Sequence, residues 1–223
     1  MLLFDIEHII HLLKNYIKMG NYFFLIIAIV LIAAFFLVRH FRSPAPSPST
    51  CKKGELDFEA PTFTLGQQFT VVSSSVYNNG NGLAVSTANF MHASGATSFN
   101  QSEITKPPHP FGSGQVMRMN NTALNFDLER ETTTAMFEYL DEGGTINLNA
   151  KGSASMYVGS MYTMPTVQVI GGVTIKKSNV QDILNPQGVK VAEKGMIVLN
   201  YSPDIGGMLI GGQELFLDNF CFN

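Results

Sequence analysis

A carboxylate within an aromatic row is the feature of this sequence that most needs a chemical explanation. Residues 214–222 read Glu-Leu-Phe-Leu-Asp-Asn-Phe-Cys-Phe, and strand alternation places Asp218 on the same face as Phe216, Phe220 and Phe222. A lone carboxylate buried in such a row costs several kcal/mol unless it is paired or bound to a cation. The sequence therefore predicts that Asp218 has a partner.

Two further carboxylates stand near residue 55, at the start of the same part of the chain. Alternation there places Leu56 and Phe58 on one face of a strand and Asp57 and Glu59 on the other. These acids belong to an acidic segment, since residues 54–223 hold 8 Lys and Arg against 15 Asp and Glu, a net charge of −7. An acidic body without a basic stripe excludes nucleic acid as a partner.

Motifs for catalysis are absent from residues 54–223. The segment has two histidines, His92 and His109, and none of the HExxH, GxSxG, P-loop or dinucleotide-binding patterns. Asp141 and Glu142 are an adjacent acid pair of the type that glycoside hydrolysis uses, but a Gly-rich turn follows them, as is typical of a solvated hairpin tip. We therefore predict a protein that is not an enzyme.

The elements that must position these residues begin with a membrane anchor. Residues 22–38 are an uninterrupted apolar run that spans about 25 Å as a helix, and Arg39 and Arg42 follow it. The run is longer than the core of a signal peptide and lacks a cleavage site, so we expect a retained transmembrane helix at 20–42. Residues 1–19 have the apolar spacing of an amphipathic or juxtamembrane helix; the alternative is that translation starts at Met19.

Residues 43–53 form a Pro/Ser-rich stalk, with three prolines in the eight residues 43–50. Two signals for orientation conflict. The cations that follow the apolar run favour a cytoplasmic C-terminal side, whereas a body whose polar surface is Asn, Ser, Thr and Gly favours the opposite side. We expect the C-terminal domain to be extracytoplasmic, at a cell surface, in a periplasm or on a virion.

Residues 54–223 are expected to form one all-β domain, an antiparallel β-sandwich, because short alternating runs are separated by turn-forming residues. We expect strands at 63–72, 82–90, 115–119, 123–128, 134–140, 145–148, 155–158, 166–175, 196–199 and 214–222. Residues 179–184 are expected to form a single helical turn.

The segments "DFE" at 57–59, "GGVTI" at 171–175 and "IGGQELFLDNFCF" at 210–222 resemble the jelly-roll domains of the carbohydrate-binding-module and galactose-binding type. They resemble most the version found on anchored extracytoplasmic proteins. The resemblance spans about 54–223, and it implies a jelly-roll sandwich in which the first and last strands lie side by side.

The resemblance also implies a structural Ca²⁺, held here by Glu59 and Asp218, with Asp57 as a further candidate ligand. The alternative is that Asp218 accepts backbone N–H bonds at a strand end. If the chain ends are neighbours, Cys51 and Cys221 form a disulfide, which would require an oxidising compartment. The alternative is two unrelated thiols.

Sugar-binding domains need aromatic platforms, and this chain has no Trp. Tyr157 and Tyr162 are the candidates, although a buried tyrosine with a satisfied hydroxyl is the commoner arrangement. We therefore expect a single-pass, non-catalytic binding or adhesion module for a glycan or protein ligand. The alternatives are a structural surface component of a virion or cell envelope that self-associates, and a pilin-like subunit.

Overall fold

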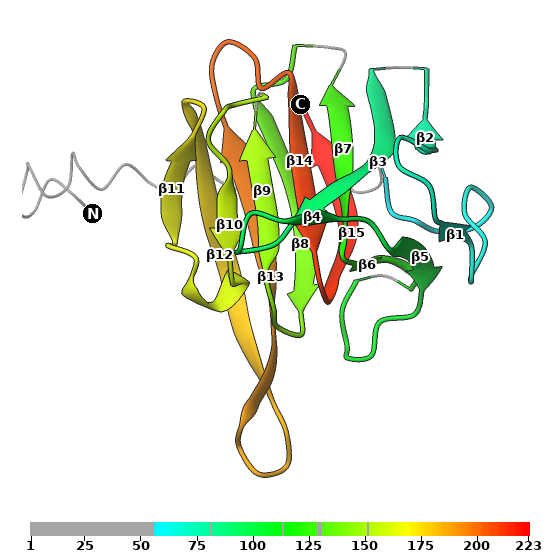
Figure 1. Cartoon of the computed structure of the whole chain (residues 1–223), viewed down its shortest axis with the longest axis vertical. Helices are drawn as coiled ribbons and strands as arrows, with labels where there is room; N and C mark the ends of the chain where they lie inside the picture. The colour runs from blue at the N-terminus through cyan, green and yellow to red at the C-terminus, as the bar shows by residue number, and fades with distance from the viewer. Residues whose placement is uncertain (1–55, 81, 113, 129–130, 151) are drawn as a thin grey trace, which may run out of the picture. The chain divides into compact units, whose positions relative to one another are not determined.

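The computed structural model describes residues 56–80, 82–112, 114–128, 131–150 and 152–223 (Figure 1). Contacts between residues divide the chain into residues 1–50 and 51–223, and every described residue belongs to the second unit. The predicted segments 1–19 and 20–42 and the stalk at 43–53 lie outside the described residues. Among those that are described, no helix is long and apolar enough to cross a membrane.

The described strands form two antiparallel sheets, which confirms the all-β prediction. Sheet I has eight strands in the spatial order β1-β5-β6-β15-β8-β13-β12-β11, and sheet II has the order β10-β9-β14-β7-β3-β2, with β4 paired to β3. The strands of sheet I are β1 (Gln68–Phe69), β5 (Gln101–Thr105), β6 (Val116–Asn120), β8 (Thr134–Asp141), β11 (Val167–Ile170), β12 (Val173–Leu184), β13 (Lys190–Asn200) and β15 (Leu215–Phe222). Those of sheet II are β2 (Ser75–Asn78), β3 (Leu83–Met91), β4 (Thr97–Ser98), β7 (Thr122–Leu128), β9 (Ile146–Ala150), β10 (Tyr157–Gly159) and β14 (Gly207–Gly212). A 3-10 turn, η1 (Met161–Thr163), follows β10.

The two sheets share one hydrophobic core, an arrangement consistent with a β-sandwich. Side chains alternate along each strand, so every second residue faces the other sheet. Phe126 of β7 in sheet II lies with its ring centroid 4.4 Å from that of Phe220 of β15 in sheet I. Phe137 of β8 stacks on the same Phe220 ring at 6.4 Å. These aromatic contacts join the sheets near the middle of the last strand.

The chain ends of the described unit meet, as the family resemblance implied. Leu56 forms an isolated antiparallel bridge with Phe220, with N–H···O distances of 3.0 and 2.9 Å. Leu56 and Phe58 are both buried, whereas Asp57 and Glu59 are half-buried, as alternation predicted. Phe58 has a φ of 56°, and residues 56–59 form this single bridge instead of a regular strand.

The prediction that Asp218 shares a face with the three nearby phenylalanines holds for Phe216 but was wrong for Phe220 and Phe222. Asn219 has a φ of 50°, and the register of β15 against β8 shifts between Asp218 and Cys221. Such a bulge adds one residue to the strand and reverses the alternation after it. Phe220 therefore faces the core between the sheets, while Phe216 packs with a separate buried cluster on the outer face of sheet I. Asp218 precedes the bulge and does not share a face with Phe220.

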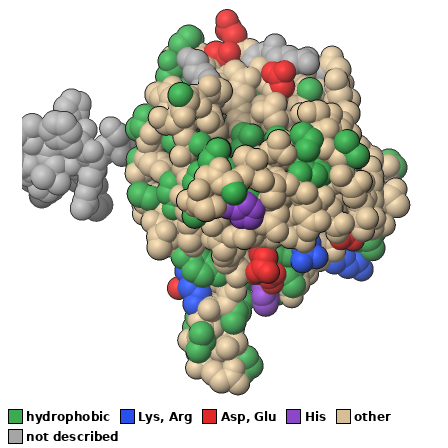
Figure 2. Space-filling view, viewed as in Figure 1, with side chains coloured by type: hydrophobic (Ala, Val, Ile, Leu, Met, Phe, Trp, Pro, Cys, Tyr) green, Lys and Arg blue, Asp and Glu red, His purple; other side chains and the backbone are tan. Residues whose placement is uncertain are grey.

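The predicted helical turn at 179–184 was also wrong, because this segment continues β12. It pairs with β13 through Gln181–Lys194, Asp182–Glu193 and Ile183–Ala192. We call residues 178–194 the long hairpin; it extends beyond the sandwich (Figure 1). Its far part exposes aliphatic side chains, which are visible on the projection in Figure 2. Leu184 and Val189 belong to this far part, whereas the exposed Val180 lies at the base of the hairpin, where β13 still pairs with β8.

Most other predicted strands are present with shifted ends, but several regions differ, and the short strands β2 and β4 were not predicted. Only Gln68–Phe69 of the predicted strand 63–72 is extended and paired. The predicted strand 166–175 is a hairpin, since Gly171 and Gly172 have φ of 59° and 84° and turn β11 into β12. Strands β5 and β14 were missed, because Ser, Gln and Glu in the first and Gly in the second conceal the alternation of apolar residues.

Candidate functional site

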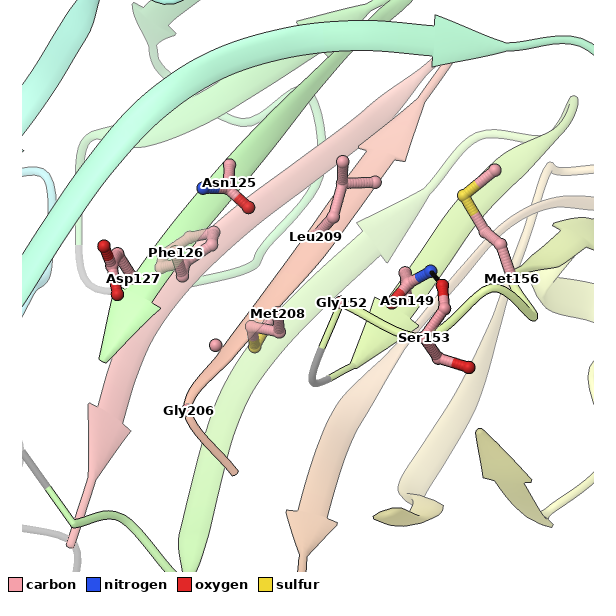
Figure 3. Close-up of a pocket in the computed structure, with 11 residues that line it drawn as sticks. Asn125, Phe126, Asp127, Asn149, Gly152, Ser153, Met156, Gly206, Met208 and Leu209 are labelled. Carbon is pink, nitrogen blue, oxygen red and sulfur yellow. Dashed lines mark hydrogen bonds between the residues drawn. The ribbon is translucent and has the colours of Figure 1, made fainter. Parts of the chain in front are cut away.

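The outer face of sheet II contains a hollow of about 540 Å³ (Figure 3). Strands β7, β9 and β14 form its floor, and the loop after β9 forms one side. The lining residues are Asn125, Phe126, Asp127, Asn149, Gly152, Ser153, Met156, Gly206, Gly207, Met208 and Leu209. We call this region the sheet II face.

A row of three residues crosses the sheet II face. Leu209 of β14 is in register with Asn125 of β7 on one side and with Asn149 of β9 on the other. Paired residues project to the same side of a sheet, and the alternate residues, such as Phe126 and Met208, are buried in the core. Because glycine at 206, 207 and 152 adds no side chain, the row lies in a shallow open depression.

The polar groups of this row can accept and donate hydrogen bonds. Asn149 donates both amide hydrogens to the carbonyls of Ser153 and Ser155, at 2.7 and 3.2 Å, which fixes its side chain and leaves Oδ1 as an acceptor. Asn125 and Asp127 are exposed on the neighbouring strand. Leu209 lies between the amides, so acceptors and donors flank an apolar patch. Ligand pockets in proteins combine apolar surface with a few placed polar groups of this type.

A second site of interest lies where Glu59 and Asp218 contact the loop between β5 and β6. Glu59 Oε1 accepts a hydrogen bond of 2.7 Å from the backbone N–H of Gln115. A Cβ added at Gly114 would lie 2.6 Å from Glu59 Oε1, and one added at Gly112 would overlap Asp218 Oδ2. The two predicted carboxylates are therefore brought to one loop, and glycine is required there for their close approach.

The third predicted ligand, Asp57, contacts the backbone of Glu59. Its Oδ1 accepts a hydrogen bond of 3.2 Å from the backbone N–H of Glu59. Asp218 is fully buried, and its Oδ1 accepts a hydrogen bond of 2.8 Å from the backbone N–H of Asn219, within β15 and not at a strand end. Within the described ranges, no group of three or more His, Cys, Asp and Glu is positioned to hold a metal ion.

A network of buried charges lies inside the sandwich, on the inner face of sheet I. Lys177 and Glu193, 7% and 3% exposed, form an ion pair of 3.0 Å between Nζ and Oε1. Tyr139 donates a hydrogen bond of 2.7 Å to the same Oε1, and Lys190 donates 2.8 Å to Oε2. Burial alone would raise the pKa of Glu193, but the hydrogen bonds from Lys190, Tyr139 and Lys177 outweigh it and lower this pKa.

Asp141 is fully buried beside this network. Its Cα is paired with that of Glu193 across β8 and β13, and its Oδ2 has no hydrogen-bond partner. Burial, with a further contribution from the charge of Glu193, raises the pKa of Asp141 to about 7. Because Asp141 is buried, the sequence prediction of a solvated hairpin tip was wrong for this residue. The Glu142 side chain is 28% exposed, and its Oε1 lies 3.5 Å from His109 Nε2.

The two tyrosines predicted to bind sugar make contacts within the protein. The Tyr157 hydroxyl donates to the carbonyl of Ser160 at 2.8 Å, and its ring packs against the core. Tyr162 lies under Lys190, whose Nζ is 4.1 Å from the ring centroid, and its hydroxyl donates to the Asp141 carbonyl at 3.4 Å. Neither residue lines the sheet II face.

Of the two cysteines predicted to form a disulfide, Cys221 is disulfide-bonded and 4% exposed. Cys51, the only other cysteine in the sequence, lies outside the described residues. The pairing of Cys51 with Cys221 therefore stays a prediction.

Sequence reasoning missed Asn125, Asp127 and Asn149, although a signal for them was present. Strands β7 and β9 contain Asn-Phe-Asp and Asn-Leu-Asn, in which polar residues alternate with one buried apolar residue. This period-two pattern marks one polar side of each strand, which is exposed at Asn125 and Asp127, although Asn147 of β9 is buried. Nothing in the local pattern indicated that β14 would lie between these strands.

Comparison with known proteins adds no family: no family model, no curated protein and no solved structure matches this chain.

Proposed function

We propose that this protein is a non-catalytic binding module that recognises a glycan on the sheet II face. The observation that carries this proposal is the row of Asn125, Leu209 and Asn149, which presents two amides around an apolar patch in an open hollow. Sugars offer vicinal hydroxyls for such amides and an apolar face for the patch between them.

A glycan array probed with the full-length chain in mild detergent tests the proposal. We expect a restricted set of related glycans to bind, and Asn125→Ala with Asn149→Ala to abolish the signal. Asn89→Ala, at an exposed residue on β3 that is not part of the hollow, is the matched control. Silence across the array would overturn the proposal.

Two further parts of the proposal concern the fold of the domain and its attachment to a membrane. We propose a jelly-roll variant, because the chain changes sheet repeatedly: it passes from sheet I to sheet II after β1, β6, β8 and β13, and it returns after β4, β7, β10 and β14. Residues 20–42 would anchor the domain in a membrane with the C-terminal part extracytoplasmic. Protease protection combined with thiol labelling tests this topology: protected, freely labelled cysteines would place the domain in the cytoplasm and exclude the disulfide.

We also propose that Glu59 and Asp218 hold a structural Ca²⁺ together with loop carbonyls, while Asp57 contributes through its contact with Glu59. Both glycines that face these carboxylates leave room that a Cβ would fill. Hard oxygen ligands suit Ca²⁺, which would neutralise the two acids and fix the loop. Addition of EGTA should lower the melting temperature of the chain, and an unchanged temperature would contradict the proposal.

Self-association is a second candidate function, favoured by one observation. Strand β11 is at the end of sheet I, and its Val167 and Val169 are 55% and 65% exposed. An exposed edge strand with β-branched residues is a template for pairing with another chain. A defined oligomer on sizing, together with silence on the glycan array, would favour this function over glycan recognition.

A further inference from the structure

A second groove, of about 200 Å³, lies on the outer face of sheet I, on the other side of the sandwich from the sheet II face. Its lining residues come from the loop between β5 and β6, from β8, and from both strands of the long hairpin. They are Phe111, Gly112, Glu138, Asn179, Gln181, Lys194, Gly195 and Met196. We call this region the sheet I groove.

Two bulges build the sheet I groove. The register of β12 shifts between Ser178 and Gln181, where Asn179 has a φ of 54°. The bulge of β15 at Asn219 lies beside Glu138, and its Nδ2 donates a hydrogen bond of 2.9 Å to Glu138 Oε2. Bulges are common beside functional sites because they redirect side chains. Here one bulge displaces Asn179 into a wall, and the other orients the carboxylate in the floor.

The wall opposite Asn179 is the loop between β5 and β6, and contacts with the long hairpin and with sheet I hold it in place. Lys194 Nζ donates a hydrogen bond of 2.8 Å to the carbonyl of Pro110. Phe111 and Ile183 pack against the buried cluster that contains Phe216, so the loop and the long hairpin share one apolar support. At the adjacent Gly112, the loop rests against the carboxylate of Asp218. The groove is therefore formed before any ligand binds.

From this arrangement, we infer that the sheet I groove is a second site that binds one neutral sugar ring. Glu138 is an acceptor for sugar hydroxyls, Lys194 is a donor, and the exposed amides of Asn179 and Gln181 serve as both. Phe111 and Met196 supply the apolar surface for a ring face. One cation and one anion line the groove, so it favours a neutral ligand. The inference rests on the proposed function, from which it takes the class of ligand.

Saturation-transfer NMR with a panel of neutral mono- and disaccharides tests the inference on the full-length chain in mild detergent. The background is the variant with Asn125→Ala and Asn149→Ala, in which the sheet II face is removed. We expect this variant to keep binding one member of the panel, and Glu138→Ala or Gln181→Ala to weaken that binding by roughly fivefold or more, as for the loss of one hydrogen bond.

Gln187→Ala is the matched control, because it removes the same type of exposed side chain from the same hairpin outside the groove. Gln181 is exposed, so its substitution tests binding even if Glu138→Ala disturbs the hydrogen bond with Asn219. If the background variant binds no sugar while the wild type does, the groove is not a site and the proposed function stands. If the wild type binds only through the groove, the inference stands and the sheet II face is wrong. Absence of all binding overturns both.

Discussion

The two sheets differ in what they bury. Within the described part of the chain, the charged side chains that are fully or almost fully buried are Asp141, Lys177, Glu193 and Asp218, and all of them belong to strands of sheet I. The buried polar residues on the strands of sheet II are neutral, namely Thr87, Thr122 and Asn147. Sheet I also carries the bulges at Asn179 and Asn219, whereas β7, β9 and β14 of sheet II pair without register shifts.

This difference explains why each sheet presents a different type of surface. Regular pairing and small residues give sheet II a smooth floor on which a row of amides is accessible. Bulges, a covering loop and the long hairpin give sheet I a walled groove, and buried ion pairs hold the hairpin's base. Irregular strands therefore need compensating contacts inside the protein. Removal of such buried contacts should lower the stability of sheet I more than that of sheet II.

The largest expected effect follows from removal of Glu193. Glu193→Ala leaves Lys177 buried without its carboxylate, and breaking a buried pair in this way costs about 3–5 kcal/mol. Denaturant unfolding of the full chain measures the loss. Asp182→Asn is the control, because Asp182 is 53% exposed where it meets Lys190 and should contribute about 1 kcal/mol or less. Equal losses of unfolding free energy for the two variants would show that the buried network stabilises the fold no more than the exposed ion pair does.

The second effect is a dependence of stability on pH that arises in sheet I. Because the pKa of Asp141 is raised from 3.8 to about 7, the folded state keeps a proton that the unfolded state has released between these values. Stability should therefore fall as pH rises through this window, by up to ~4 kcal/mol, and become level above pH 7.

The contribution of Glu193 to stability does not change within this pH window. Its folded pKa is lowered below 4.5, so its contribution is complete above pH 4.5 and is lost only at lower pH. Asp141→Asn should remove the decline between pH 5 and pH 7, whereas Asp127→Asn, at an exposed residue of sheet II, should leave it unchanged. Denaturation midpoints at several pH values measure both. A decline that persists in Asp141→Asn would assign it to another group.

A third, smaller effect concerns the loop that covers sheet I. Gly112 and Gly80 have φ of 66° and 65°, so alanine strains the backbone equally at either position. Only at Gly112 would the Cβ overlap another group, Asp218 Oδ2, since nothing lies within 4 Å at Gly80. We expect Gly112→Ala to cost about 2 kcal/mol and Gly80→Ala about 1 kcal/mol. The melting temperature of Gly112→Ala should also respond less to EGTA, and similar losses would contradict the close contact.

The smallest effect is expected for a neutral buried pair. The Thr122 and Ser102 hydroxyls are 2.7 Å apart and buried between β7 and β5. Thr122→Val keeps the shape of the side chain and removes the hydrogen bonds that its hydroxyl makes with Ser102 and, at 3.3 Å, with the carbonyl of Gln101, which should cost about 1 kcal/mol. Unfolding of this variant beside Glu193→Ala gives a direct measure of how the two types of buried polar group differ. A loss of unfolding free energy as large as that of Glu193→Ala would contradict the proposed difference between charged and neutral buried groups.

Local pattern was enough to predict the regular strands but not the irregular ones. Strands β7, β8 and β9 were expected near their observed positions, because apolar and polar residues alternate in them. The left-handed Asn219 reverses the alternation of β15, and its effect depends on the pairing with β8, which the sequence does not show. The segment 179–184 is a strand because β13 pairs with it, against its local preference for a turn.

The candidate sites depended on tertiary placement in the same way. Glu59 and Asp218 could be expected near each other only through the resemblance, and their common contact is the loop at Gly112 and Gly114. Lys177 and Glu193 were not recognised as a pair, since 16 positions separate them in the sequence and each stands among ordinary strand residues. Asn125 and Asn149 become a single surface only because β14 lies between their strands.

The most direct test of glycan recognition on the sheet II face is a binding titration with the best glycan from the array. Wild-type protein, the variant with Asn125→Ala and Asn149→Ala, and the control Asn89→Ala are compared under the same conditions. We predict saturable binding by the wild type and the control, and a loss of about tenfold or more in affinity for the variant at the sheet II face, as expected for two lost hydrogen bonds. Equal affinity of all three proteins would contradict the account.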